Sequence, residues 1–135
     1  MILLLLEIRF IKFMDTIQTK SKGKILSYKS IFISDVHLGH RKSAANKLLE
    51  FYKHSRSENL YLVGDIIDVW ALKSNFYWPQ EHNDVIKKTL RKARHGTKVK
   101  YIIGNHDDVF RKFLPLHFGD IEVINRAIHV SADNK

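Results

Sequence analysis

The stretch "VKYIIGNHDD", residues 99–108, decides the fold, because it changes abruptly from apolar to polar at Gly104. Val99–Ile103 has the mainly apolar, β-favouring composition that is typical of a strand buried inside a sheet. An amide, an imidazole and two carboxylates follow directly after the glycine. An ordinary polar turn has the same composition, so this stretch indicates a functional site only if other strands end in the same way.

Two earlier segments repeat the apolar pattern, with helical periodicity between the three segments. Ile31–Ser34 and Leu60–Val63 are predicted to be short buried strands. One helix is predicted from Ser43 to about His54, and a second from Pro79 or Gln80 to Arg94. Strands and helices that alternate with short links indicate an α/β fold with a parallel sheet and right-handed crossovers.

The segment after the third strand is predicted to add a short helix and a β-hairpin. Residues 107–114 fit the short helix. Residues 121–124 and 127–131 are predicted to be strands joined by a turn at 125–126. In the longer of the two main helices, the inward apolar stripe is expected to consist of Ile86, Leu90 and Ala93.

Polar side chains follow all three core strands. In chain order they are Asp35 and His37, Asp65 and Asp68, and Asn105 and His106. Ligands of an open α/β sheet bind at the carboxyl ends of its strands, so a parallel sheet brings these groups to one edge. One such group is weak evidence, whereas three at equivalent positions predict one composite site.

The residue types in this composite site indicate divalent metal ions. Carboxylate, imidazole and amide ligands together suit Mn, Fe or Zn better than Ca. Asp35 and His37, on the same side of an extended segment, can chelate one ion, and Asp65 can bridge two ions. Asn105 offers a neutral ligand to a second ion, and His106 is the candidate that stabilises or protonates a leaving oxygen.

Turn and capping chemistry is the alternative interpretation, because Asp and Asn favour such positions in any protein. It explains each polar group singly but not all three together. For Asp68 and Asp107, local hydrogen bonding or helix capping is the better interpretation.

The three motifs closely resemble the first three motifs of the calcineurin-like metallophosphoesterases. They are Asp35-x-His37, Gly64-Asp65-x-x-Asp68 and Gly104-Asn105-His106-Asp107. The resemblance implies a metallophosphoesterase-like layered α/β sandwich, here a βαβαβ core with a C-terminal β-hairpin region. It also implies two divalent ions, with Mn expected first and Fe or Zn as alternatives. Asp35 and His37 would bind one ion, and Asp65 would bridge both. Asn105 would bind the second ion, and His106 would act on the phosphate.

The sequence around the motifs, over residues 29–135, is similar to that of the bacterial UDP-2,3-diacylglucosamine hydrolases. The similar segments are "LYLVGDIIDVW", "YWPQEHNDVIKKTLRKARHGT" and "LHFGDIEVINRAIH". This resemblance implies hydrolysis of UDP-2,3-diacylglucosamine to UMP and lipid X in the lipid A pathway. Two features depart from the resemblance. The best-studied members of the subgroup carry arginine at the position of His106, and the later His-Gly-Asp and Gly-His-x-His segments of the family do not occur here. We therefore expect the N-terminal half of such an enzyme, poorly active as it stands.

The charge balance favours anionic partners, because the formal net charge is +9 and the pI is near 9.8. Residues 86–100 contain seven Lys or Arg and no acid, which fits contact with an anionic membrane or an ordinary solvated face. Arg41 is a candidate for binding a substrate phosphate, with simple solvation as the alternative. The expected partner is a nucleotide-sugar lipid or another phosphodiester, with nucleic acid as the second choice.

Residues 1–24 are expected to be a leader and linker, and residues 25–135 the N-terminal part of the phosphoesterase domain. The first apolar run ends at Leu6, far short of the ~20 residues of a membrane helix. The chain has no cysteine, which is compatible with a reducing compartment. We expect a cytoplasmic protein, or one held peripherally at the inner face of the membrane. The alternatives for its function are a nucleic-acid phosphodiesterase and a catalytically inactive fragment or binding module.

Overall fold

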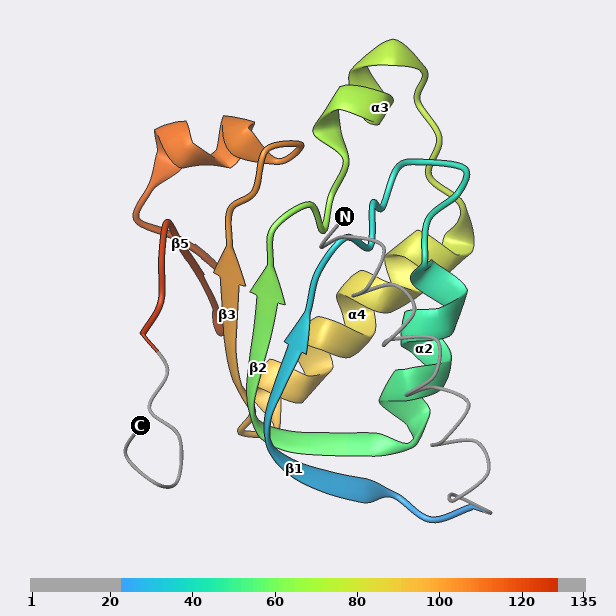
Figure 1. Ribbon diagram of the computed structural model, residues 1–135, viewed down its shortest axis with the longest axis vertical. Coiled ribbons are helices and arrows are strands. Elements are labelled where there is room, and N and C mark those ends of the chain that lie inside the picture. The colour runs from blue at the N-terminus through green and yellow to red at the C-terminus, as the bar shows by residue number, and fades with distance from the viewer. Residues whose placement is uncertain (1–22, 129–135) are drawn as a thin grey trace, which may run out of the picture.

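The structure is a computed structural model that describes residues 23–128, and its centre is a five-stranded sheet (Figure 1). The strand order across the sheet is β1-β2-β3-β5-β4. Neighbouring strands are parallel except β4 and β5, which form an antiparallel pair. The strands are β1 (Leu26–Ile33), β2 (Ser55–Val63), β3 (Lys98–Ile102), β4 (Leu116–Phe118) and β5 (Ile121–Ile124). The α/β class with a parallel βαβαβ core is therefore confirmed.

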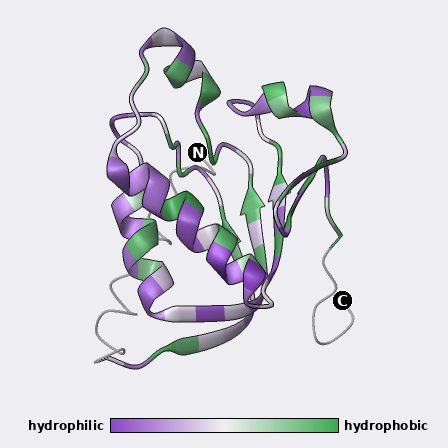
Figure 2. Ribbon diagram, turned by 180° about the vertical axis from the view of Figure 1, so that it is seen from behind, coloured by the Kyte–Doolittle hydropathy of each residue, from purple (hydrophilic) through white to green (hydrophobic). Residues whose placement is uncertain are grey.

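Two long helices cover one face of this sheet, and two short ones lie near the carboxyl ends of the strands (Figures 1 and 2). The long helices are α2 (Ala45–Lys53) and α4 (Gln80–Arg94). The short ones are α3 (Val69–Ser74) and the 3-10 helix η1 (Asp108–Phe113). Within residues 23–128, no helix is both long and apolar enough to cross a bilayer.

The core lies between the long helices and the sheet. Its fully buried apolar side chains include Leu38, Leu48, Leu60, Ile66 and Val85. Polar side chains inside this core form hydrogen bonds; for example, the Tyr52 hydroxyl lies 3.0 Å from the Thr89 hydroxyl. Burial raises the pKa of Tyr52 to about 12, although the hydrogen bond with Thr89 opposes the shift, so the phenol remains neutral at physiological pH.

The predicted elements are largely present, but their bounds differ. The first two strands begin earlier than expected, at Leu26 and Ser55, because main-chain pairing between β1 and β2 extends into their polar halves. The predicted turn at 125–126 is wrong for the described hairpin, which instead turns at Gly119 and Asp120 between β4 and β5. Of the predicted strand 127–131, residues 127–128 are not strand and the others lie outside the described residues.

Helix α4 buries a stripe that agrees with the predicted one only at Ala93. Its fully buried residues are His82, Val85, Thr89 and Ala93. The predicted Ile86 and Leu90 pack against the core but stay partly exposed. A polar residue such as His82 is tolerated inside because it has a partner: the Gly39 N–H donates to its Nδ1 at 3.0 Å.

Candidate metal centre

The loops that follow β1 and β2 are joined by main-chain hydrogen bonds beyond the ends of the strands. The Asp35 N–H donates to the Gly64 carbonyl at 3.2 Å, and the His37 N–H donates to the Asp65 carbonyl at 3.0 Å. A third bond, from Leu38 N–H to the Ile66 carbonyl, measures 2.8 Å. The backbone itself therefore places the polar residues of both loops at one edge of the sheet.

At this edge, Asp35, His37 and Asp65 each direct one ligand atom toward a common point. The three atoms lie within 4.8 Å of one another. Nε2 of His37 is 3.6 Å from Oδ1 of Asp35, and both side chains are about one-third exposed, at 28% and 30%. Two carboxylates and an imidazole in this arrangement form a compact, accessible ligand set for a divalent ion.

All three of these residues adopt left-handed backbone conformations, with φ of 56° at Asp35, 52° at His37 and 53° at Asp65. The predicted extended Asp-x-His segment is therefore wrong, although the two side chains still converge. The difference arises because the loop bends to keep its main-chain bonds to the loop after β2. A left-handed non-glycine residue costs roughly 1–2 kcal/mol, and such strain concentrates at functional sites.

Gly64 and Gly104 face each other at the ends of β2 and β3, and Gly104 has no room for a side chain. A Cβ at Gly104 would lie 2.6 Å from the Asp65 nitrogen and 2.8 Å from Cα of Gly64. Only Gly64 has a positive φ, of 69°, so Gly104 is needed for its small size rather than for a left-handed turn. Asn105 follows this contact directly and is exposed, and its side chain has no hydrogen-bond partner within residues 23–128.

Asp68 connects the two histidines of the site. Its Oδ2 lies 3.0 Å from Nδ1 of His37, and its Oδ1 lies 3.0 Å from Nδ1 of His106. Oδ1 also accepts from Ala71 N–H at 2.9 Å, so the predicted capping role is confirmed at the start of α3. Sequence reasoning missed its contacts with both imidazoles.

The ionisation of Asp68 suits this position. Burial raises the pKa of its carboxyl group, but the bonds from Ala71, His106 and His37 outweigh burial and lower the pKa to about 2. The resulting carboxylate accepts from Nδ1–H of both histidines, which directs the other ring nitrogen of each away from Asp68.

His106 lies between the metal ligands and a small pocket. Its main-chain N–H donates to Oδ1 of Asp65 at 2.7 Å, and the centre of its ring lies 4.4 Å from the centre of the Trp70 ring. The hydrogen bond to Asp68 raises the pKa of His106, although desolvation opposes the shift. We call the adjoining space the His106 pocket; it measures about 180 Å³, and its lining includes Trp70, Lys73, His106, Asp108 and Lys112.

Asp107 is fully buried and fixes the loops beneath the site. It accepts from Ile66 N–H at 3.1 Å, from the Tyr101 hydroxyl at 2.5 Å and from Gly104 N–H at 2.5 Å. It makes no side-chain cap on η1, so the expected local hydrogen bonding is present and the expected capping is not. Burial and the Asp107 charge raise the pKa of Tyr101, which keeps this hydroxyl protonated as a donor.

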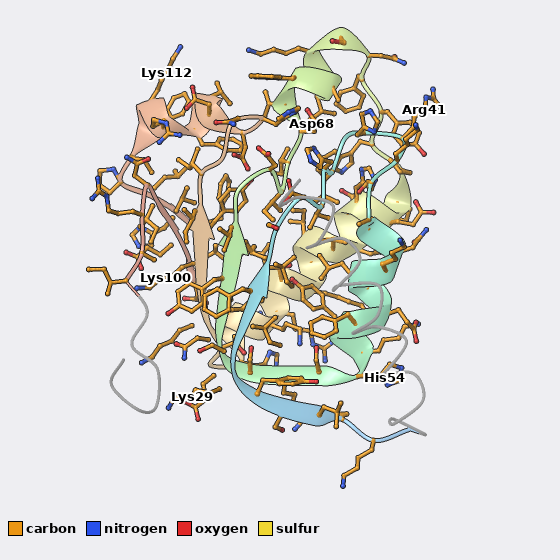
Figure 3. The ribbon with its side chains drawn as sticks, viewed as in Figure 1. Lys29, Arg41, His54, Asp68, Lys100 and Lys112 are labelled. Atoms are coloured by element: carbon orange, nitrogen blue, oxygen red, sulfur yellow. The ribbon has the colours of Figure 1, made fainter. Side chains whose placement is uncertain are left out.

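Arg41 does not join this group of side chains. Its guanidinium lies 4.7 Å from the centre of the Tyr77 ring, in a cation–π contact. Figure 3 places Arg41 on the outer side of the loop after β1, well separated from Asp68. Its assignment to a substrate phosphate therefore stays a prediction.

The residues present fit a divalent ion, and one of two possible groups fits it better. Besides Asp35, His37 and Asp65, the side chains of His37, Asp68 and His106 also cluster. In the second group, both carboxylate oxygens of Asp68 form hydrogen bonds with the histidines. Asp68 therefore orients the histidines and does not itself bind the ion. Asp35, His37 and Asp65 would therefore hold the ion.

Comparison with known proteins gives one match. The family model described as calcineurin-like phosphoesterase matches residues 28–132. Searches of curated proteins and of solved structures gave no significant match. The general chemistry supported by the family match is metal-dependent hydrolysis of phosphoesters. The chain belongs to the calcineurin-like phosphoesterase family.

Proposed function

We propose that the protein hydrolyses a phosphodiester or pyrophosphate bond with two divalent ions, Mn being the first choice and Fe or Zn the alternatives. The observation that supports this most is the arrangement of Asp68, which holds one histidine of the ligand set and one histidine beside the His106 pocket. A shared carboxylate fixes the position of a metal ligand relative to a proton donor. Hydrolysis requires this, because the attacking water and the leaving oxygen act at the same phosphorus atom.

In this proposal Asp35, His37 and Asp65 hold one ion, and Asp65 with Asn105 contributes to a second. Such ions supply Lewis acidity toward phosphate oxygens and lower the pKa of water. Oδ1 of Asp65 accepts from His106 N–H, so this carboxylate is oriented before any ion binds. Preformed ligands reduce the reorganisation that binding requires.

His106 would protonate the leaving oxygen or donate a hydrogen bond to the phosphate. Its Nδ1 is engaged by Asp68, which leaves Nε2 for the substrate. The raised pKa increases the protonated fraction of the imidazole near neutral pH, as a general acid needs. The positive charges of Lys73 and Lys112 beside the same pocket would attract the phosphate.

UDP-2,3-diacylglucosamine is the substrate we propose first, with UMP and lipid X as products and Arg41 as a further phosphate contact. The support is the sequence resemblance, together with Trp70, a residue that is 57% exposed beside the His106 pocket and whose ring suits stacking against uracil. The same proposal places the protein in the cytoplasm, with peripheral contact at the inner face of the membrane. A lipid-linked substrate requires that contact.

A nucleic-acid phosphodiesterase is the second candidate. Two features favour it: the net charge of +9, and the exposed Trp70 beside Lys73 and Lys112. Sites that bind single-stranded nucleic acid combine basic groups with aromatic rings on which bases stack. Salt-sensitive binding and cleavage of single-stranded DNA would favour this candidate over the lipid substrate.

The test uses the full chain, freed of metal by a chelator and then titrated with Mn²⁺. Hydrolysis of bis(p-nitrophenyl) phosphate, UDP-2,3-diacylglucosamine and single-stranded DNA is then compared. Asp65→Asn should abolish the activity, whereas Asp120→Asn, the same change in the exposed β4–β5 turn, should retain it. Full activity in Asp65→Asn contradicts the proposal. Stoichiometric metal binding without hydrolysis of any substrate indicates a binding module instead.

A further inference from the structure

A basic hollow lies at the end of the sheet opposite to the candidate metal centre. It is a half-open space of about 720 Å³ between the start of β2 and the C-terminal half of α4. Because a strand rises about 3.3 Å per residue, Ser57 in its wall is roughly 20 Å from Val63, where β2 ends before the candidate metal centre. We define the basic hollow by Arg56, Lys88, Arg91 and Lys92, with Tyr52 in its lining.

The cations of the basic hollow come from two elements and converge. Lys88, Arg91 and Lys92 are spaced i, i+3 and i+4, which places them on one face of α4. Arg56 faces them from β2. Figure 2 shows the hydrophilic character of the outward side of α4.

These cations lack acidic partners within residues 23–128. No ion pair joins Arg56, Lys88, Arg91 or Lys92 to a carboxylate in the described part of the chain. The acid in the lining, Glu58, has its carboxylate 2.8 Å from Lys29 Nζ and is therefore compensated from outside the hollow.

Lys92 is the most constrained of the four. Its ammonium group donates to the Ser55 carbonyl at 2.9 Å and lies 4.9 Å from the centre of the Tyr52 ring. Burial lowers the pKa of Lys92, and the charges of Arg56 and Lys88 lower it further. Like charges gathered around a half-buried ammonium are unfavourable unless an anion lies among them.

The helix dipole accounts for only part of this cluster, because Arg91 and Lys92 lie in the last turn of α4 but Lys88 and Arg56 do not. Cations near the C-terminus of a helix are favoured only within its last turn. Lys88 lies well before the end of α4 at Arg94, and Arg56 belongs to a strand. The last carbonyls are also satisfied already, since the N–H groups of residues 95–97 donate to those of residues 91–93.

We infer that the basic hollow is a second, non-catalytic site that binds a phosphate-bearing anion such as a pyrophosphate. Its volume falls in the range of small-molecule sites, and the Lys and Arg groups from two walls suit several phosphate oxygens at once. This inference does not rest on the proposed catalytic function. The phosphate group can belong to a soluble molecule or to a lipid headgroup.

The test measures binding of inorganic pyrophosphate to the metal-free full chain by calorimetry at fixed ionic strength. Metal-free protein lacks the ions of the catalytic site, and the double variants and NMR shifts described below distinguish the basic hollow from the His106 pocket. Lys88→Gln/Arg91→Gln should weaken binding at least about tenfold, because it removes two charge-assisted contacts. The matched control is Lys87→Gln/Arg94→Gln, which removes the same charge from the same helix outside the lining and should change affinity less than about twofold.

Several outcomes overturn the inference. They are the absence of pyrophosphate binding, an equal loss in both double variants, and pyrophosphate-induced amide NMR shifts at Asn105 instead of Ser57 and Thr97. Circular dichroism and urea unfolding would show that the variants remain folded. Sedimentation with phosphatidylcholine vesicles containing phosphatidic acid then distinguishes the source. Selective loss of sedimentation in Lys88→Gln/Arg91→Gln supports a headgroup, and equal sedimentation of both variants supports a soluble ligand.

Discussion

Nδ1 of His37 lies 3.0 Å from Oδ2 of Asp68, so a buried carboxylate orients a histidine whose other nitrogen faces Asp35. The same carboxylate caps α3 through Ala71. The start of a helix and the direction of a ligand therefore depend on one side chain, and the two roles can be separated by mutation.

Asp68→Asn should separate them. An asparagine still caps a helix, so the helical content should be retained. The loss of the charge should lower Mn²⁺ affinity or activity by about 10–100-fold, as is typical when the partner of a ligating histidine is changed. Isothermal titration and hydrolysis of bis(p-nitrophenyl) phosphate measure this, with Asp84→Asn on α4 as the matched control. Equal metal affinity and activity in the two variants would show that Asp68 acts as a cap alone.

Asp107→Asn should destabilise the fold even without metal. The fully buried carboxylate accepts from Ile66 N–H, Gly104 N–H and the Tyr101 hydroxyl, and an amide NH₂ would face at least one of these donors. An unsatisfied buried donor costs roughly 1–3 kcal/mol. Urea unfolding of the metal-free chain measures the loss, and a value no larger than that of the exposed Asp120→Asn would contradict the role given to Asp107.

Gly104→Ala should distort the site through steric contact. Its Cβ would lie 2.6 Å from the Asp65 nitrogen and 2.7 Å from Oδ1 of Asp65, so the backbone must shift. Gly96→Ala is the matched control, because φ there is 101° but no atom lies within 4 Å of the added carbon. The control should show only backbone strain of about 1 kcal/mol. We expect loss of Mn²⁺ binding in Gly104→Ala alone, and retained binding would show that the loops can separate without cost.

Protonation of His82 should lower the free energy of unfolding in mild acid. Burial lowers the pKa of His82 below its ordinary 6.5, although Glu81 opposes the shift, so the unfolded chain takes up the proton first. Stability from this group is present above pH 6.5 and is lost as the pH falls through the folded pKa. The Gly39 N–H also loses its acceptor on protonation.

The measurement is the free energy of unfolding of the metal-free chain between pH 7.5 and 5, for the wild type and for His82→Gln. Glutamine offers an acceptor to Gly39 but does not titrate, so the difference between the two proteins isolates His82. A difference that stays constant across this range would contradict the role of His82. His106, with its raised pKa, acts in the opposite direction and cancels in the comparison.

The sequence predicted the order of the elements and the meeting of the three polar groups, because both follow from apolar periodicity and parallel strands. Periodicity also located α4 correctly at Gln80–Arg94. It did not identify His82 and Thr89 as buried residues of α4, since their burial depends on hydrogen bonds with Gly39 and Tyr52, which are distant in sequence.

The supporting side chains of the site were harder to predict than its ligands. In the sequence, Asp68 and Asp107 can be explained locally, as caps or turn residues. Only the fold shows that Asp68 contacts His37 and that Asp107 contacts Ile66, each more than thirty residues away, and that Asp107 also contacts Tyr101 of β3. The left-handed backbone at Asp35 and His37 was likewise hidden, because it results from pairing between two loops rather than from the residues themselves.

That pairing between loops makes the site sensitive to the length of the chain as well as to the identity of its ligands. The bonds from the N–H groups of Asp35, His37 and Leu38 run to consecutive carbonyls of residues 64–66. Because the backbone forms these bonds, the pairing itself does not depend on which side chains stand at Val36 or Ile66, although both are buried in the core. One residue inserted between Ser34 and Leu38 would instead shift Asp35 out of step with Asp65. In this family member we therefore expect evolution to tolerate conservative exchanges at the other positions of this segment more readily than insertions or deletions.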